Sequence, residues 1–328
     1  MELVDADSLG AWLDAEDLEP GRPLKIEPLG GGSSNAMFVV ERGKARWVLR
    51  RPTRVAVDRA NEGMHREFRM LAALAGTDVP HPEVVALCDD HDVLGCTFYL
   101  MERVQGVNPF PLPAVFESEQ GRAEVAYSMV EALGRLHLVD WRTAGLGDLG
   151  RPEGFHQRQV DRWSRQLASY EGRDLPGIET VMAWLESNLP HDGASTIMHG
   201  DYHMLNVLIA PERPGRVVAI LDWETATIGD PLLDLAGFCE VWCPVANEGW
   251  PSRSELVERY RSVRGLGALG DLTYYEVLYN FRLAVLLEGI FQRSLRDPTR
   301  PDQDDMGERV FYNLDRALAL IEGGGSSS

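Results

Sequence analysis

The sequence predicts an α+β fold with two lobes, an N-terminal five-stranded antiparallel sheet with a helix and a C-terminal lobe rich in helices. Short segments of alternating apolar residues, separated by turns, fill residues 1–104, which is typical of antiparallel strands. Beyond residue 113, apolar residues recur three and four positions apart over long stretches, as in amphipathic helices. A polar loop and a short hairpin interrupt these helices at residues 196–222. We therefore expect lobes at 1–104 and 105–322, with residues 323–328 as a flexible tail.

The composition is that of a soluble globular chain of 328 residues, 44% hydrophobic and 25% charged. The 32 basic and 51 acidic residues give a net charge of −19, which disfavours nucleic acid and anionic membranes because it repels phosphate groups. The first ten residues, MELVDADSLG, lack the basic and apolar regions of a signal peptide, and no apolar run is long enough to span a membrane. A cytoplasmic protein with buried, reduced thiols is expected. These thiols are Cys88, Cys96, Cys239 and Cys243.

The N-terminal lobe is expected to begin with an amphipathic helix at residues 5–18. Strands at 24–29 and 37–39 then flank a glycine-rich loop, in which residues without a Cβ let backbone N–H groups approach phosphate oxygens. An ordinary hairpin turn would use similar residues. The loop residues expected to contact phosphates are Gly31, Gly32, Ser33 and Ser34.

The next strand, at residues 45–50, ends in Arg50. A guanidinium can bind two oxygens of a phosphate or a carboxylate at once, although a solvent-facing arginine would also fit a strand. A helix with one apolar face follows at residues 59–75. Glu67 adjoins that face and is the expected partner of Arg50, with Glu62 as the rival.

Strands at 84–87 and 97–101 complete the expected sheet. The chain then reaches a connection between the lobes whose backbone carbonyl and amide groups could bind the edge of an adenine. The residues of this connection are Met101, Glu102, Arg103 and Val104. Gly- and Pro-rich residues 106–113 mark the lobe boundary.

The C-terminal lobe shows helical periodicity, and His137 at a helix end is expected to be structural. Arginines and tryptophans in residues 141–163 could line a substrate cleft, although buried tryptophans and solvated arginines explain them as well. Asp230 is expected to cap a helix that begins with Pro231, and Asp234 to tie the polar loop in place. The expected helices cover residues 125–137, 155–170, 252–264, 273–295 and 304–321.

The polar loop and its hairpin carry the chemistry. The sequence TIMHGDYHMLNVLIAPERPGRVVAILD contains a strand ending at Asp201, a turn reaching Asn206, and a hairpin that returns to Asp222. Phosphoryl transfer needs a carboxylate to receive a hydroxyl proton, and oxygen ligands to hold Mg²⁺. Asp201 precedes Asn206 by five positions, as in the protein-kinase catalytic loop H-R-D-x-x-x-x-N. The hairpin would bring Asp222 beside Asn206, so the joint pattern favours a site over ordinary turn residues.

HGDYHxxN followed by a strand and DWE resembles the aminoglycoside-phosphotransferase-like kinases, the choline kinase/APH family. More narrowly, it resembles the branch found beside or fused to acyl-CoA dehydrogenases. The resemblance implies a protein-kinase-like fold, ATP as phosphoryl donor and Mg²⁺ as cofactor. Arg50 takes the place of the kinase lysine, and Asp222 begins the segment that replaces D-F-G. His199 would brace the loop, and His203 would either face the transferred phosphoryl group or pack within the loop.

The expected function is therefore ATP- and Mg²⁺-dependent phosphorylation of a hydroxyl group on a small molecule. Asp201 would accept or orient the hydroxyl proton, while Asn206 and Asp222 hold Mg²⁺. The branch implies a hydroxyacyl-CoA-like acceptor and association with an acyl-CoA dehydrogenase pathway. The acidic surface instead favours a cationic aminoglycoside or amino alcohol. A catalytically silent nucleotide-binding regulatory module is a third alternative, although such a module has no chemical need to keep all three residues.

Overall fold

The computed structural model describes residues 3–30, 35–53, 58–170, 172–191, 193–245, 249–296 and 303–324. The chain divides into two compact units. Unit 1 contains Met1–Ala132, Val139–Leu149 and Met204–Ala226, and unit 2 contains Leu133–Leu138, Gly150–His203 and Thr227–Ser328. The expected lobe boundary after residue 104 stays a prediction, since in this division the predicted hairpin and residues 105–132 group with the sheet.

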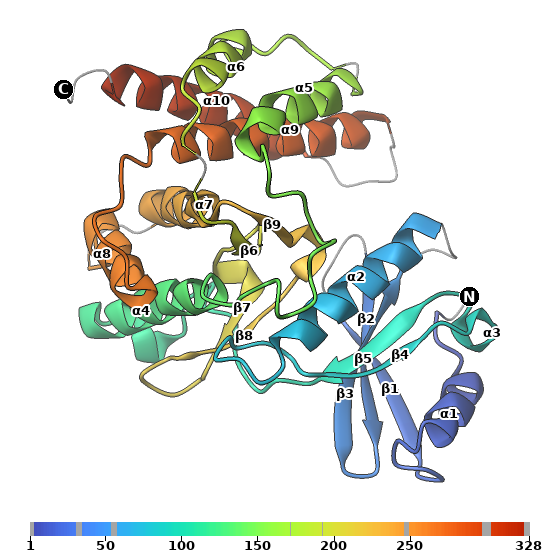
Figure 1. Cartoon of the computed structure of the whole chain (residues 1–328). Coiled ribbons are helices and arrows are strands. Elements are labelled where there is room, and N and C mark those ends of the chain that lie inside the picture. The colour runs from blue at the N-terminus through green and yellow to red at the C-terminus, as the bar shows by residue number, and fades with distance from the viewer. Residues whose placement is uncertain are drawn as a thin grey trace. The chain divides into compact units, whose positions relative to one another are not determined.

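The core of unit 1 is the predicted five-stranded antiparallel sheet, in the order β1-β2-β3-β5-β4 (Figure 1). Long hairpin pairings join β1 to β2 and β2 to β3, and β5 lies between β3 and β4. The strands are β1 (Leu24–Leu29), β2 (Asn35–Arg42), β3 (Ala45–Pro52), β4 (Val84–Cys88) and β5 (Phe98–Glu102).

The alternation of side chains along these strands separates a structural face from a functional face. On one face, Val40, Leu49 and Leu100 are fully buried in a cluster with Leu9 and Leu13 of helix α1 (Ala6–Ala15). Helix α3 (His91–Leu94) contributes Leu94 to the same cluster. The strand neighbours of these residues point to the opposite face, which helix α2 (Asp58–Leu74) partly covers.

A second, two-stranded sheet in unit 1 forms the predicted hairpin, β7 (Val207–Ile209) with β8 (Val217–Ile220). Helix α4 (Glu119–Leu136), whose first 14 residues belong to this unit, supports the hairpin: Ser128 Oγ accepts a hydrogen bond of 2.8 Å from the Val217 N–H. Single-turn helices precede and follow the hairpin at Met204–Asn206 and Trp223–Thr225.

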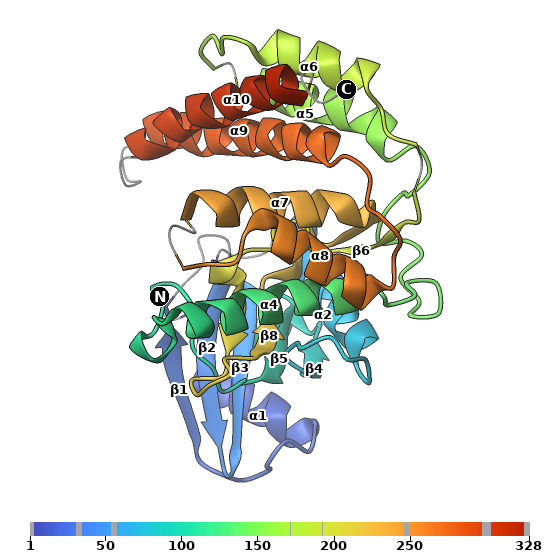
Figure 2. The same ribbon diagram turned by 90° about the vertical axis from the view of Figure 1, so that its left-hand side faces the viewer.

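Unit 2 is mainly helical, as predicted for this part of the chain. Figure 2 shows α9 and α10 running side by side, and their contact encloses a core that includes Ala284 and Val310. A short antiparallel pair, β6 (Thr196–Met198) with β9 (Thr227–Gly229), carries the polar loop. The helices are α5 (Gln159–Ala168), α6 (Ile178–Ser187), α7 (Pro231–Val245), α8 (Arg253–Arg264), α9 (Thr273–Arg296) and α10 (Asp304–Gly324).

Several helix ends follow from local chemistry. Asp230 caps α7 by accepting from the Leu232 N–H at 3.0 Å, and Pro231 occupies the first helical position, as predicted. Ser252 and Glu255 form a capping box at the start of α8. Among the described residues, no helix is both long and apolar enough to cross a membrane.

The structure also contains elements that the sequence did not predict, namely α3, α6 and β9. Helix α10 continues to Gly324, so the first two residues of the expected tail are helical. The thiols of Cys88 and Cys96 are free and buried, as expected, Cys239 is also buried, and the side chain of Cys243 lies outside the described part of the chain.

Candidate active site

The glycine-rich loop expected to contact phosphates, Gly31–Ser34, lies outside the described residues. The strands on either side of it are described. Leu29 and Gly30 precede the loop and Asn35 follows it, and all three line a cavity on the functional face of the sheet.

Arg50 and Glu67 form the predicted ion pair on this face, with 2.9 Å between Arg50 Nε and Glu67 Oε2. Both side chains are buried, whereas the rival Glu62 is exposed, so the structure selects Glu67. Burial disfavours the charge on Arg50, but Glu67, Tyr99 and Asp222 outweigh it and raise the pKa of the guanidinium. Arg50 is therefore ionised at every accessible pH.

The carboxyl group of Glu67 has a raised pKa. Burial raises its pKa to about 7 despite the opposing charge of Arg50, and the nearby carboxylates of Asp222 and Glu224 add to the rise. The Tyr99 hydroxyl donates a hydrogen bond to Glu67 Oε2 at 3.4 Å. The Arg50 guanidinium thus lies close to the carboxyl groups of Glu67, Asp222 and Glu224.

The hairpin places Asn206 and Asp222 as predicted. The Leu221 N–H donates a hydrogen bond to the Asn206 carbonyl at 2.8 Å, which continues the β7–β8 ladder and sets the two candidate metal ligands at the same end of the hairpin. Asp222 has φ 63° and ψ 68°, a left-handed conformation that is unfavourable for most residues without a local reason. Its carboxylate accepts a hydrogen bond from Arg50 Nη2 at 3.0 Å.

Asn108 holds the turn that carries Asn206. Its side-chain amide donates to the carbonyls of Met204 and Leu205, each at 3.0 Å, and of Val207 at 3.3 Å. The sequence analysis missed this residue, because a polar side chain in a Gly- and Pro-rich segment gives no signal of a contact 96 residues away.

These residues of unit 1 meet in one cavity of about 650 Å³, within the usual size range of small-molecule sites. Its polar lining includes Arg50, Glu67, Asn206 and Asp222. The rest of its lining is largely apolar, as suits the planar faces of a nucleobase. The apolar side chains include Leu29, Met37, Val48, Leu71, Pro82, Met101, Val104, Leu205, Leu208, Leu221 and Trp223.

The expected adenine-binding connection borders the same cavity. Met101, Glu102 and Val104 all contribute to its lining. The Glu102 N–H already donates to the Glu83 carbonyl at 2.7 Å, whereas the Val104 N–H has no acceptor among the described residues. The Val104 amide, at the edge of the cavity, is therefore available to bind a ligand.

The loop expected to carry the catalytic base belongs to unit 2, where Asp234 of α7 anchors it. Asp234 Oδ2 accepts from the His199 N–H at 2.6 Å, and Oδ1 accepts from the Gly200 N–H at 2.9 Å. Gly200 has φ 82°, which side-chain-bearing residues rarely adopt. His137 contacts Asp234 at 3.3 Å and the Tyr260 hydroxyl at 2.7 Å, so the predictions of an anchoring Asp234 and a structural His137 are confirmed.

Asp201 follows this anchored segment and is about half exposed. Its Oδ2 lies 3.4 Å from Nε2 of His203. Burial of the carboxyl opposes its ionisation, but His203, His199 and Arg282 together hold the pKa of Asp201 below its usual value. A carboxylate in this state can accept a proton at neutral pH. Because Asn206 and Asp222 belong to unit 1, the expected convergence of Asp201 with them stays a prediction.

Tryptophans 141 and 163 are both largely buried, and each has an arginine against its ring: Arg142 lies 4.1 Å from the Trp141 centroid and Arg162 lies 5.0 Å from the Trp163 centroid. These contacts agree with the core-packing alternative for the tryptophans and leave the role of the arginines open.

The model of the phosphotransferase enzyme family (APH) matches residues 25–266 of the chain. The chain is 32% identical over 313 residues to acyl-CoA dehydrogenase family member 11 of Pongo abelii, a match that covers 89% of this chain and 40% of that protein. It thus spans less than half the length of the acyl-CoA dehydrogenase family members that it matches.

A crystal structure from Ralstonia eutropha, of a protein provisionally named an aminoglycoside phosphotransferase, has a TM-score of 0.86 with 30% identity, covering 97% of this chain and 98% of the other. The GDP complex of aminoglycoside 2'-phosphotransferase-IIIa has a TM-score of 0.66 over 94% of this chain and 98% of that one. Its identity is 17%, so it shows the fold alone. The predicted kinase-like fold and the resemblance to the dehydrogenase-linked branch are both confirmed, and the chain belongs to the phosphotransferase enzyme family.

Proposed function

We propose that this phosphotransferase moves the γ-phosphoryl group of ATP, with Mg²⁺, to a hydroxyl group of a small molecule. The observation that carries the proposal is the unit 1 cavity, in which an apolar part adjoins a part lined by Arg50, Asn206 and Asp222. The apolar part suits the adenine, with the Val104 amide as a donor to its edge. Arg50, fixed by Glu67, steadies the phosphates, and the backbone of Gly31–Ser34 covers them.

Asn206 and Asp222 have the right donor chemistry for Mg²⁺, since amide and carboxylate oxygens are its preferred protein ligands. Two protein ligands suffice for this ion, because nucleotide phosphates and water complete its coordination. Bound there, Mg²⁺ would neutralise phosphate charge. Asp222 is at present hydrogen-bonded to Arg50, and both groups are needed beside the phosphates in this assignment.

Asp201 is the proposed base, supported by its spacing of five residues before Asn206 and by its stabilised carboxylate form. The acceptor oxygen forms a bond to the γ-phosphorus as the bond from phosphorus to the β,γ-bridging oxygen breaks. ADP leaves, and the hydroxyl proton passes to Asp201. His199 braces the loop, and His203 orients the Asp201 carboxylate or meets the transferred group.

The proposed acceptor is a hydroxyacyl metabolite, such as a hydroxyacyl-CoA. The relatives named acyl-CoA dehydrogenases favour this choice, and so does the positive charge of Arg282 near Asp201, which acts locally against the net charge of −19. We also propose that the product serves an acyl-CoA dehydrogenase. A cytoplasmic location suits this role and the free thiols of Cys88 and Cys96.

The assay that tests this function measures ADP formation from Mg-ATP alone and with panels of hydroxyacyl-CoAs, amino alcohols and aminoglycosides. Acceptor-dependent ADP formation with a hydroxyacyl compound, and a phosphorylated product by mass spectrometry, are expected. Turnover only with aminoglycosides, which the names of the solved relatives suggest, would replace the acceptor but keep the enzyme. Tight Mg-ATP binding without turnover of any acceptor would favour a regulatory module.

A further inference from the structure

Gly200, the residue before Asp201, is held at both its N–H and its carbonyl within unit 2. Asp234 of α7 accepts from the Gly200 N–H at 2.9 Å, and Nη2 of Arg282, from α9, donates to the Gly200 carbonyl. Gly200 needs this support because its φ of 82° lies outside the regions that a chain adopts readily with other residues. The carbonyl bound by Arg282 belongs to the peptide bond that begins Asp201, so a shift of the guanidinium would move the Asp201 backbone directly.

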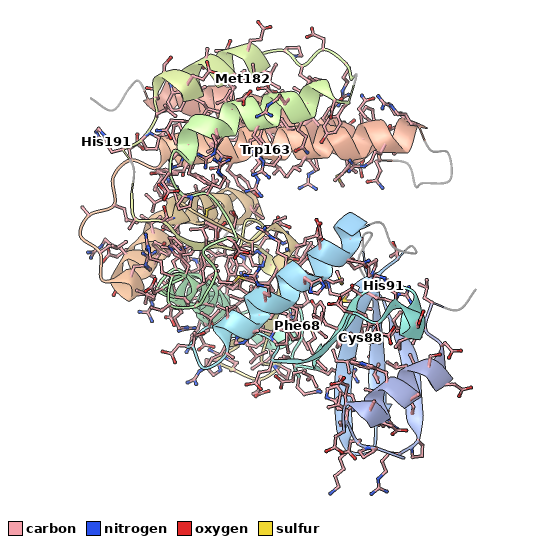
Figure 3. The ribbon with its side chains drawn as sticks, turned by 45° about the vertical axis from the view of Figure 1, so that its right-hand side comes forward. Phe68, Cys88, His91, Trp163, Met182 and His191 are labelled. Atoms are coloured by element: carbon pink, nitrogen blue, oxygen red, sulfur yellow. The ribbon has the colours of Figure 1, made fainter. Side chains whose placement is uncertain are left out.

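Arg282 is itself fixed. Its guanidinium carbon lies 5.4 Å from the centroid of the Trp163 ring, within the range of a cation–π contact. Figure 3 shows Trp163 on α5, at the side that faces α9. The Nε of Arg282 is buried and has no hydrogen-bond partner among the described residues. The small space bounded by Gly200, Asp234 and Arg282 leaves about 10 Å³ for a ligand, too little for a substrate group.

We propose that Arg282 is a positioning residue for phosphoryl transfer, which fixes the Asp201 carboxylate through the Gly200 carbonyl and supplies the nearby positive charge that keeps it available as a base. This proposal rests on the proposed function, because it takes Asp201 as the base. The positive charge of Arg282 and its hydrogen bond to the Gly200 carbonyl both act on Asp201. Burial opposes ionisation of Asp201, but His203, His199 and the Arg282 guanidinium together hold the pKa of this carboxyl below its usual value.

The geometry separates this role from substrate binding. Arg282 uses its guanidinium for the backbone of the loop and for the face of a buried tryptophan. Small misplacements of a reacting group cost large factors in rate, so loss of the guanidinium should affect turnover far more than nucleotide binding. A lysine in its place would keep the charge but not the planar group that stacks on Trp163 while donating sideways.

The test compares wild type with Arg282→Met, Arg282→Lys and Asp201→Asn, using steady-state hydrolysis of Mg-ATP without an added acceptor, so that water stands in for the hydroxyl acceptor. Arg165→Met is the matched control, because Arg165 forms an exposed pair with Asp161 on α5. Hydrogen exchange of the peptide covering residues 197–204 is measured in the same variants.

We expect Arg282→Met to lower kcat about 10- to 100-fold with KM for Mg-ATP changed less than about threefold. In Arg282→Met, hydrogen exchange at residues 199–201 should become faster, whereas hydrogen exchange in α10 should stay unchanged. Arg282→Lys should recover part of the kcat that Arg282→Met loses.

Each other outcome has a definite meaning. Unchanged exchange at 199–201 in Arg282→Met overturns the positioning role, whatever the rate does. Faster exchange with a wild-type rate shows that Arg282 supports the loop without serving catalysis, which also overturns the proposal. If Asp201→Asn itself hydrolyses ATP at the wild-type rate, the assignment of the base fails, and with it the proposed function. A loss of rate in Asp201→Asn but not in Arg282→Met rejects this inference alone.

Discussion

Arg50 on β3 donates a hydrogen bond of 3.0 Å to the carboxylate of Asp222, a residue 172 positions later in the chain, while its Nε lies 2.9 Å from Glu67. One buried guanidinium therefore links the sheet, helix α2 and the end of the β7–β8 hairpin. Since Arg50 and Asp222 are the groups assigned to phosphate and metal, this contact makes their roles interdependent.

Replacing Arg50 tests the phosphate contact. Arg50→Lys and Arg50→Ala should weaken ATP binding about tenfold or more, because a bidentate charge-assisted contact is lost and Glu67 loses its buried partner. Binding is measured by isothermal titration calorimetry. Arg46→Lys is the control, because Arg46 lies exposed on the same strand. Wild-type affinity in Arg50→Ala would return Arg50 to a structural role.

Replacing Asp222 tests the metal assignment. In the wild type, Mg²⁺ should strengthen nucleotide binding because the cation offsets phosphate charge. Asp222→Asn should remove that gain and turnover together, whereas Glu224→Gln, which changes a neighbouring carboxylate, should keep both. Titrations of ATP with and without Mg²⁺ measure this gain in affinity for the wild type and for each variant. A gain that is lost only in Glu224→Gln would move the metal ligand to that residue.

The raised pKa of Glu67 predicts a pH-dependent stability. The unfolded carboxyl titrates near its usual value of 4.5 and the folded one near 7, so this group stabilises the fold fully below 4.5 and loses that contribution as the pH rises through 7. The free energy of unfolding of the wild type, relative to the non-titrating Glu67→Gln, should fall by about 3 kcal/mol over this interval. Urea unfolding of the nucleotide-free protein at several pH values measures it.

Glu62→Gln is the control for that series, because Glu62 is exposed on the same helix and should show no such trend. A difference between wild type and Glu67→Gln that grows with pH would mean that Arg50 keeps Glu67 ionised.

Arg66 should matter for nucleotide binding although it is not part of the cavity lining. It precedes Glu67 on α2 and donates to the carbonyls of Leu149 at 2.7 Å and Ala226 at 2.5 Å, which fixes the helix that presents Glu67. Arg66→Met should destabilise the protein by about 1.5–3 kcal/mol, the scale of hydrogen bonds from a charged group, and weaken ATP binding. Arg69→Met, which removes an exposed pair with Asp148, should do much less. Equal effects of the two variants would contradict this account.

Local patterns predicted much of the fold and the site. The alternation along the strands and the spacing of apolar residues in helices identified most elements, because burial of one face enforces both periods. The hairpin geometry predicted that Asp222 returns to Asn206, and the apolar face of α2 favoured Glu67 over Glu62. Each of these relationships depends on residues close in sequence or on one recognisable face.

Contacts between distant segments were not predictable in this way. The pairing of β6 with β9, the three hydrogen bonds of Asn108 and the contact of Arg282 with Gly200 all join segments whose approach depends on the whole fold. Helix α6 was missed because it has only ten residues and lies between polar segments. The left-handed conformation of Asp222 has no signal in the sequence, since aspartate is equally at home in ordinary turns.

The central claim is that Asp201 serves chemistry rather than nucleotide binding, and Asp201→Asn tests it most directly. The variant keeps the shape of the side chain but cannot accept the hydroxyl proton. With an acceptor found among hydroxyacyl-CoAs, amino alcohols and aminoglycosides, we predict near-unchanged Mg-ATP affinity and phosphorylation that falls about 100-fold or more. Phosphorylation of that acceptor by Asp201→Asn at the wild-type rate would contradict the catalytic role of this loop.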